Sequence, residues 1–193
     1  MPWAVTRAAN SRGQCCLTTS IMNPSNSLTL RPFKLSDADD VLKYVSDDQV
    51  TKFLGMETIT TKDEALAYIT NECMPLPWHM SICINDRSIV DVPSFNHEGH
   101  KAEIGYCLAR KYWGQGIATQ ALKMSVKMVL KDFPEIVRLE AFADVENIGS
   151  QRVLEKDGFK KEGILRKNTF IKGSIVDEFI YSFLSTDVTK AKL

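Results

Sequence analysis

The chain has 193 residues, of which 44% are hydrophobic and 25% charged, and its formal net charge is zero. This length predicts one domain with a sizeable core. The balanced charge excludes the basic surface of a nucleic-acid binder or a polybasic membrane anchor, and no apolar run could span a bilayer. We therefore expect no nucleic-acid or membrane partner. The chain has five cysteines, an odd number that cannot pair fully into disulfides, and no two of them have the spacing of a metal site. This pattern favours reduced thiols in an intracellular protein.

The first 27 residues differ in composition from the rest. They hold Arg7 and Arg12, no acidic residue, and many Ser, Thr and Asn. An organelle transit peptide, a disordered tail and a natural start at Met22 all fit this composition. We therefore expect an extension over 1–27, one domain over 28–187 and a tail over 188–193. The expected location is the cytoplasm, or a plastid or mitochondrion if residues 1–21 are a transit peptide.

The N-terminal part of the domain reads as a strand followed by helices. Residues 27–33 alternate apolar and polar side chains, which predicts a strand. Ser36, followed by three aspartates, predicts a helix N-cap. The apolar stripe of that helix is Ala38, Val41, Leu42 and Val45. Residues 46–54 predict a further helical turn or two. A helix over 60–73 would begin with a capping box of Thr61 and Glu64.

The C-terminal part alternates strands and helices. Strands are predicted over 79–85, 88–92, 101–109, 135–143, 159–165 and 175–184, and helices over 116–131 and 147–158. The first two strands resemble a hairpin around Asn85–Arg87, and Gly158 stands where a helix C-terminal glycine is expected. Residues 96–100 predict a polar loop.

Two glycines stand where the helix over 116–131 begins, in ARKYWGQGIATQALK at 109–123. The first N–H groups of a helix lack partners within it, and glycine leaves them open to a phosphate. An ordinary tight turn would use the same residues. A P-loop is excluded because no Lys-Ser or Lys-Thr follows. A Rossmann fingerprint is excluded because Thr119 stands in its third glycine position.

AEIGYCLARKYWGQGIATQALK, followed by VENIGSQRVLEKDGFKKEG, resembles the GNAT family of acyl-CoA N-acyltransferases, in the branch typified by RimJ and RimL. The resemblance spans about residues 28–184 and is densest over 103–163. It implies an α/β fold: a mixed, mostly antiparallel sheet, helices on both faces, and two strands that splay to admit CoA. It also implies acetyl transfer from acetyl-CoA to a primary amine by direct attack in a ternary complex, without a metal.

The resemblance implies a set of cofactor-binding residues. In the pyrophosphate loop Trp113 takes the first place, Gly116 the fourth and Ala118 the sixth. Trp113 departs from the usual Gln or Arg, so backbone N–H groups would bind the phosphates. The implied set is Leu108, Trp113, Gly114, Gln115, Gly116, Ile117, Ala118 and Thr119, with Asn147 contacting the pantetheine arm.

Glu103 is the first candidate for the general base. Strand alternation places it on one face with Gly105 and Cys107, and family members often use a carboxylate on this strand. A glutamate in solvent or in an ion pair would show the same pattern. Asp144 is a weaker alternative. Some relatives place the base at the position of Thr169, which cannot serve here.

Ser150 is the candidate general acid, in an N-x-x-S sequence with Asn147. Simple N-capping explains the same pair, and the resemblance adds that this serine protonates the leaving thiolate. Tyr181 fits core packing better than the acid role that tyrosine has in many GNAT enzymes. Cys107 suggests an acyl-cysteine, but a buried inert thiol is favoured.

Two further segments bear on the acceptor. His97 and His100 lack the spacing of a metalloprotease motif, and they read as a solvated loop beside the substrate. Residues 87–92 lack the glycine that is usual in this branch near Val90, which affects the strand or the substrate cleft. The acceptor is expected to be a peptide or protein N-terminus. The alternatives are a polyamine or arylalkylamine, or a non-catalytic acyl-CoA-binding module. Monomer and homodimer both stay open.

Overall fold

The computed structural model describes residues 28–96 and 99–187. The predictions for residues 1–27, His97 and residues 188–193 lie outside the described residues. The helical elements are η1 (Leu35–Asp37), α1 (Ala38–Val45), α2 (Asp48–Thr51), α3 (Lys62–Tyr68), η2 (Ile69–Cys73), η3 (Arg110–Tyr112), α4 (Ile117–Asp132), α5 (Ile148–Asp157) and η4 (Ser185–Asp187). The strands are β1 (Leu28–Pro32), β2 (Trp78–Ile84), β3 (Arg87–Asn96), β4 (Lys101–Ile104), β5 (Cys107–Leu108), β6 (Arg138–Asp144), β7 (Lys160–Ile171) and β8 (Ser174–Leu184).

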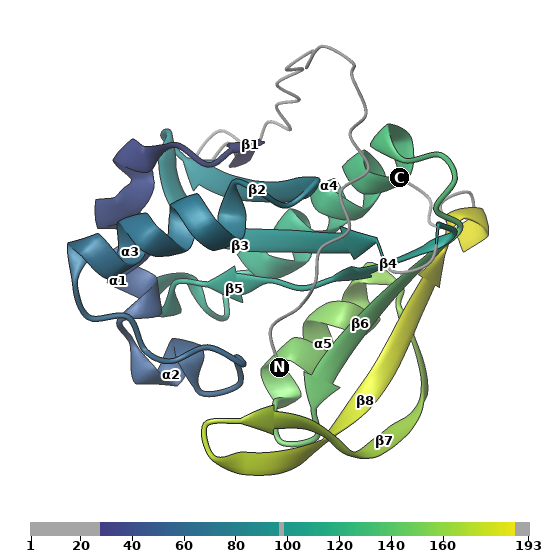
Figure 1. Cartoon of the computed structure of the whole chain (residues 1–193). Helices are drawn as coiled ribbons and strands as arrows, with labels where there is room; N and C mark the ends of the chain where they lie inside the picture. Colours follow the sequence, from purple (N-terminus) through teal and green to yellow (C-terminus); the bar gives the residue numbers. More distant parts are fainter. Residues whose placement is uncertain (1–27, 97–98, 188–193) are drawn as a thin grey trace.

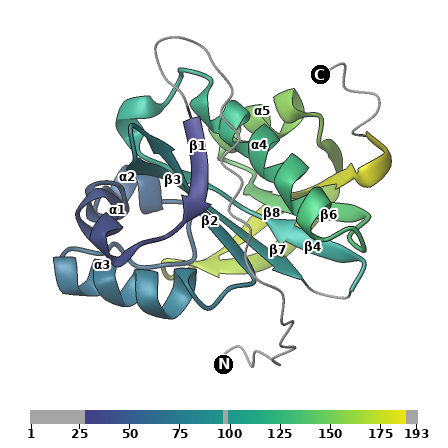
Figure 2. The same cartoon turned by 90° about the horizontal axis from the view of Figure 1, so that it is seen from above.

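The strands in the described part of the chain belong to one sheet, with the order β1-β2-β3-β4-β6-β8-β7 and with β5 paired to β3. Among the described strands every pair is antiparallel except β4 with β6. Helices α1 to α3 pack on one face of the sheet, and α4 and α5 pack on the other (Figures 1 and 2). The prediction of a mixed, mostly antiparallel sheet with helices on both faces is confirmed.

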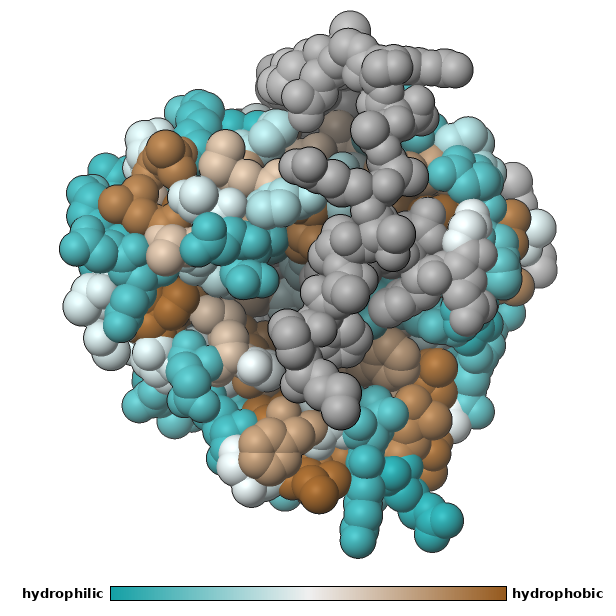
Figure 3. Space-filling model, viewed as in Figure 1, coloured by the Kyte–Doolittle hydropathy of each residue, from teal (hydrophilic) through white to brown (hydrophobic). Residues whose placement is uncertain are grey.

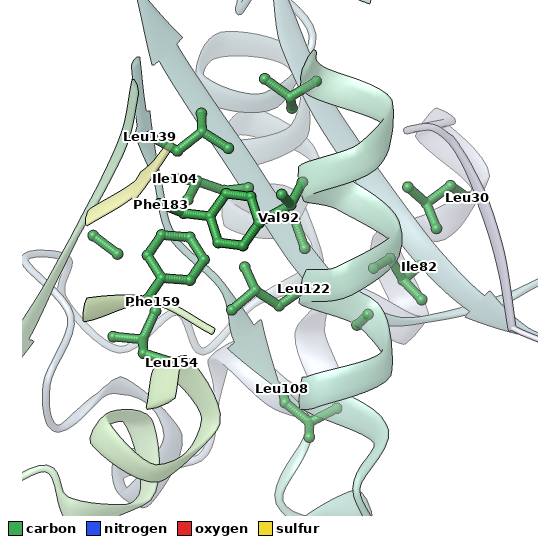
Figure 4. Packing of buried hydrophobic residues seen from close by; sticks show 14 of the residues in the cluster. Leu30, Ile82, Val92, Ile104, Leu108, Leu122, Leu139, Leu154, Phe159 and Phe183 are labelled. Atoms are coloured by element: carbon green, nitrogen blue, oxygen red, sulfur yellow. The ribbon is translucent and has the colours of Figure 1, made fainter. Parts of the chain in front are cut away.

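The larger hydrophobic core lies between the sheet and α4 with α5. Figure 4 shows Leu122 of α4 facing Val92, Ile104 and Leu139 of the sheet, beside the aromatic pair of Phe159 and Phe183. Leu122 is fully buried, and such burial contributes about 1.5–3 kcal/mol. Because α4 packs over the centre of the sheet, its N-terminus is fixed relative to the neighbouring strands.

The strand hairpins turn through left-handed residues. Asn85 and Asp86, between β2 and β3, have φ of 52° and 62°, as a two-residue type I′ turn requires. Lys172 and Gly173 play the same part between β7 and β8, with φ of 45° and 85°. The predicted hairpin around residues 85–87 is therefore present. A second, longer hairpin forms the C-terminal edge of the sheet.

The predicted N-cap at Ser36 is wrong, because Ser36 lies inside η1. Asp37 caps the turn instead, and its carboxylate accepts a 2.8 Å hydrogen bond from the Lys34 N–H. Arg31 donates two further bonds to the same carboxylate, at 2.7 and 2.8 Å. Arg31, the residue that holds the Asp37 carboxylate, belongs to β1. The local pattern of serine and aspartates therefore did not reveal which residue forms the cap.

Three strand boundaries also differ from the prediction. β3 continues to Asn96, four residues beyond the end of the strand predicted over 88–92. The strand predicted over 101–109 is broken at Gly105 and Tyr106 into β4 and β5. β7 runs to Ile171 through a bulge, where its pairing with β8 shifts between Leu165 and Thr169. No helix in the described part of the chain has the length and apolar character needed to cross a membrane.

Candidate active site

The sheet opens between two neighbouring strands. β4 pairs with β6 only from Lys101 to Glu103, where Glu103 stands opposite Glu140. Beyond that point the chain stays with β3: the Gly105 N–H donates to the Pro93 carbonyl at 3.2 Å, and β5 pairs with β3. β6 continues along β8 as far as Asp144. A split therefore separates β5 from β6, as expected for a splayed-strand cleft.

Two helix N-termini follow the separated strands. α4 begins shortly after β5, and α5 begins shortly after β6. Because β4 and β6 are parallel, the strand ends that lead to these helices lie at the same end of the sheet. The split is therefore closed beside Glu103 and open toward two helix N-termini, whose positive ends favour anions.

The mouth of α4 is bare backbone. Its N-cap residue, Gly116, has φ of 77° and no side chain that could cap the helix, and Gly114 has φ of 73°. A Cβ added at either glycine would meet no atom within 4 Å. The first-turn N–H groups, from Ile117 to Thr119, have no intrahelical acceptors. This open cradle is suited to an anionic group.

Side chains on either side of the glycines bond back to the preceding loop. The Trp113 indole N–H donates to the Leu108 carbonyl at 2.8 Å, and the Gln115 amide donates to the Lys111 carbonyl at 2.8 Å. Trp113 is half exposed. Both residues therefore shape the loop through side-chain hydrogen bonds to its backbone carbonyls.

The mouth of α5 is capped. The Asn147 Oδ1 accepts the Ser150 N–H at 3.0 Å, so the simple capping role exists. The Ser150 hydroxyl has a partner of its own, because its Oγ lies 2.9 Å from the hydroxyl of Tyr106. Sequence reasoning missed Tyr106. The signal available was a phenol next to a glycine in the strand before the loop, but nothing local gives its partner.

Glu103 lies on the face of the sheet away from α4. Its neighbours Ala102 and Ile104 are buried in the core beneath α4, and strand alternation turns Glu103 to the opposite face. Glu103 is half-buried and stands at the closed end of the split. Its strand partner is Phe95 and that of Cys107 is Asp91, four residues apart in β3, so the pairing keeps Glu103 and Cys107 on one face.

The alternative acid and base candidates lie in different environments. Asp144 is buried at the end of β6, and its Oδ1 accepts the Glu146 N–H at 2.7 Å. Tyr181 is fully buried and donates to Glu155 at 3.4 Å, and burial raises its pKa. This position agrees with the predicted core role. Thr169 donates its hydroxyl to Glu178, a buried carboxylate of β8.

Two further predicted residues, Cys107 of β5 and His100 before β4, have other surroundings. Cys107 is half-buried and packs against the smaller core under α1 and α3. His100 is exposed. No group of three or more His, Cys, Asp or Glu side chains within residues 28–96 and 99–187 could hold a metal ion. A split sheet with an open helix mouth on one side defines an α/β protein whose split is suited to an extended ligand with an anionic end.

Comparison with known proteins agrees with this geometry. The family model of the acetyltransferase (GNAT) domain matches residues 27–160. An uncharacterized N-acetyltransferase, p20 of Bacillus licheniformis, is 31% identical over 169 residues, covering 83% of this chain and 94% of p20. A ribosomal-protein-serine acetyltransferase of Escherichia coli is 30% identical over 106 residues, 53% of this chain and 59% of that protein. The spermidine N(1)-acetyltransferase of the same species is 23% identical over 164 residues, 79% and 83% of the two chains.

Solved structures show the same fold. A GNAT-family acetyltransferase from Bacillus anthracis superposes with a TM-score of 0.73 at 26% identity, covering 81% of this chain and 94% of that one. RimJ of Mycobacterium smegmatis, in complex with CoA-disulfide, gives a TM-score of 0.76 at 23% identity, covering 89% and 88%. The chain belongs to the GNAT acetyltransferase family, and it is an acyl-CoA-dependent N-acetyltransferase. Within the family it is similar to proteins of the RimJ/RimL-like branch.

Proposed function

We propose that this enzyme acetylates the N-terminal amine of a peptide or protein, with Glu103 as general base and Ser150 as general acid. One observation carries the assignment of roles. The sheet splits between Glu103, on the face away from α4, and the N-termini of α4 and α5. A donor held at the helix mouths and an acceptor arriving from the other face would meet at the closed end of the split.

The residues of the α4 mouth would hold the diphosphate. The bare backbone from Gly114 to Thr119 supplies N–H donors without a side chain between the two glycines and the ligand. The Leu108 carbonyl and Asn147 border the split at its open end. The thioester of acetyl-CoA supplies an activated acyl carbon, and the amine nitrogen attacks it as the C–N bond forms and the C–S bond breaks.

The proton balance gives Glu103 and Ser150 separate tasks. A primary ammonium carries three protons and the amide product carries one, so two protons leave nitrogen. Glu103 takes one and passes it to solvent. The second proton leaves the nitrogen for solvent after the attack. Ser150 donates its hydroxyl proton to the departing sulfur and regains one from solvent, so the reaction releases one net proton. Each such group typically contributes about 10²–10⁴-fold in rate.

Three observations support a peptide acceptor. The relative from Escherichia coli that matches residues of this chain at 30% identity is named for a ribosomal-protein serine. The face of the sheet away from α4, which we call the acceptor face, is a strand surface on which Arg138 of β6 pairs with Glu140 of β6 and Glu162 of β7. The tip of the β7–β8 hairpin carries Phe170 and Ile175, a cross-strand pair that is 66% and 63% exposed.

Figure 3 shows hydrophobic residues among hydrophilic ones at the lower edge of the molecule, over this hairpin. Residues that follow a peptide's terminal amine could pack on such a surface, whereas a polyamine would gain nothing from it. The similarity to spermidine N(1)-acetyltransferase keeps a small amine as the second candidate.

Competition kinetics test the acceptor. Peptides that begin with Ser, Ala or Met compete against spermidine and an arylethylamine, with CoA release as the readout. We expect the best peptide to exceed both small amines in kcat/KM. A tenfold preference for a small amine, about 1.4 kcal/mol of transition-state discrimination, would overturn the peptide acceptor. Acetyl-CoA binding without CoA release in the presence of any of these amines would instead indicate an acyl-CoA-binding module.

A further inference from the structure

Tyr106 connects the two sides of the split between β5 and β6. It lies at the break between β4 and β5, on the side of the split where the chain stays paired with β3. Its hydroxyl contacts α5, the helix that follows β6 on the other side of the split. The Tyr106 hydroxyl lies 2.9 Å from the Ser150 Oγ and donates to the Ser150 carbonyl oxygen at 3.1 Å. No other side chain in residues 28–96 and 99–187 forms a hydrogen bond with the Ser150 hydroxyl. Tyr106 is therefore the group that sets the direction of that hydroxyl.

A proton count shows what the contact can do. The phenol has a single proton, and two oxygens of Ser150 are within reach of it. When that proton goes to the Ser150 carbonyl, the Ser150 hydroxyl proton finds its acceptor in the Tyr106 oxygen. When the phenol donates to the Ser150 Oγ, the Ser150 proton must point elsewhere. Rotation of the phenol O–H thus decides whether the Ser150 proton is available to another acceptor.

The surroundings keep Tyr106 a donor. Burial raises the pKa of its phenol above the usual range, so the group stays neutral and protonated at physiological pH. A neutral phenol donating to the Ser150 Oγ stabilises negative charge that develops there when the serine gives up its proton.

We propose that Tyr106 is a positioning residue for acetyl transfer: its hydroxyl holds the Ser150 Oγ and, by donating to it, directs the Ser150 proton into the split. The sulfur takes that proton as the C–S bond breaks, and the Tyr106 hydrogen bond stabilises the Ser150 oxygen until a proton returns from solvent. This inference rests on the proposed role of Ser150 as general acid. It gives Tyr106 no contact with the substrate.

A double-mutant cycle of Tyr106→Phe and Ser150→Ala tests the coupling. We expect Tyr106→Phe to lower kcat about tenfold or more in the wild-type background, with the Kd for acetyl-CoA changed less than twofold. In the Ser150→Ala background the same substitution should change kcat less than twofold, because the residue through which it acts is absent. The matched control is Tyr181→Phe, which removes a buried phenol that bonds Glu155 instead and should leave kcat unchanged.

Other outcomes overturn the proposal in distinguishable ways. Effects on kcat that multiply in the double variant would show that Tyr106 does not act through Ser150. Loss of acetyl-CoA affinity with an unchanged kcat at saturation would show a purely structural tie. If Ser150→Ala itself retains wild-type kcat, the general acid of the proposed function is wrong. If Ser150→Ala lowers kcat but Tyr106→Phe leaves kcat unchanged, the positioning role of Tyr106 is wrong and the role of Ser150 stands.

A second substitution covers the case in which Tyr106→Phe fails to fold. 3-Fluorotyrosine at position 106 keeps the ring and the hydroxyl, and it makes the phenol a stronger hydrogen-bond donor. We expect kcat to stay equal or to rise. A fall in kcat with the fold intact would overturn the proposal.

Discussion

Glu103 of β4 lies beside Glu140 of β6 at the last paired position before the sheet splits. The two carboxylates are neighbours in the strand register. The Arg138 guanidinium donates to the Glu140 Oε1 at 2.7 Å, and the Lys101 ammonium lies 3.9 Å from its other oxygen. Glu140 therefore lies within reach of two cationic side chains, both on its own face of the sheet.

Replacing Glu103 by Gln should lower turnover by about 10²-fold or more at neutral pH, because the amide cannot accept the ammonium proton. The affinity for acetyl-CoA should change little, since the donor would bind at the helix mouths. Glu140→Gln is the matched control, and we expect it to cost less than about threefold in kcat. Steady-state kinetics over pH 6 to 9, with calorimetric titration of acetyl-CoA, measure both. Wild-type turnover in Glu103→Gln would move the search for the base to Asp144.

Sequence reasoning reached those features of the site that depend on neighbours in the chain. The glycine at the mouth of α4 and the Asn147 cap of Ser150 both follow from short-range backbone rules, and both are present. The bond between Tyr106 and Ser150 joins residues 44 positions apart. Nothing in the periodicity of either segment encodes that distance, so only the folded chain reveals the pair.

The break in the strand predicted over 101–109 was also missed because it depends on contacts between residues distant in sequence. Alternation over 101–109 looks continuous because Glu103 and Cys107 do share a face, yet the pairing with β6 ends between them while the pairing with β3 continues. Which neighbour a strand follows is a tertiary choice, made here by the bond from Gly105 to Pro93 and by β5. The resemblance implied the split, whereas local pattern alone predicted one unbroken strand.

Adding a methyl group at Gly116 should weaken acetyl-CoA binding tenfold or more. The Cβ would project into the open cradle where phosphate oxygens are expected to approach the N–H groups. Gly173→Ala is the control: its φ of 85° is also left-handed and its surroundings are equally open, but it lies in the β7–β8 turn. Both substitutions carry a similar backbone cost of about 1–2 kcal/mol. Equal acetyl-CoA affinities for the two variants, measured by calorimetry, would contradict the phosphate role.

Removing the Lys172 ammonium should raise the acceptor KM several-fold and leave the Kd for acetyl-CoA unchanged. Lys172 stands at the tip of the β7–β8 hairpin and donates to the Thr51 and Thr58 hydroxyls at 2.7 and 3.0 Å. Figure 1 shows this tip beside the α2 segment. The bond thus ties two segments that flank the acceptor face. Lys172→Ala is compared with Lys160→Ala at the other end of β7, and an effect confined to acetyl-CoA binding would argue against the role in acceptor binding.

Asp157, the last residue of α5, should make the stability of the enzyme depend on pH. Burial raises the pKa of its carboxyl from 3.8 to about 7, against the opposing influence of Lys123 and Lys127. Its Oδ1 is buried and has no hydrogen-bond partner within residues 28–96 and 99–187. A carboxylate at a helix C-terminus is also unfavourable toward the helix dipole. The charged form is therefore the one that the folded state disfavours.

The sign of the effect follows from proton binding. Between pH 4 and 7 the folded protein retains a proton that the unfolded chain has released, so the Asp157 contribution to the free energy of unfolding falls as pH rises, and it is constant above about pH 7. Asp157→Asn removes the charge and keeps the shape. At pH 8 we expect the variant to be more stable than the wild type by about 1 kcal/mol, a value discounted for partial solvent contact, which corresponds to about 2–4 °C in Tm. At pH 4.5 the two proteins should unfold together in urea. A stability difference of equal size at both pH values would show that packing, and not ionisation, distinguishes them.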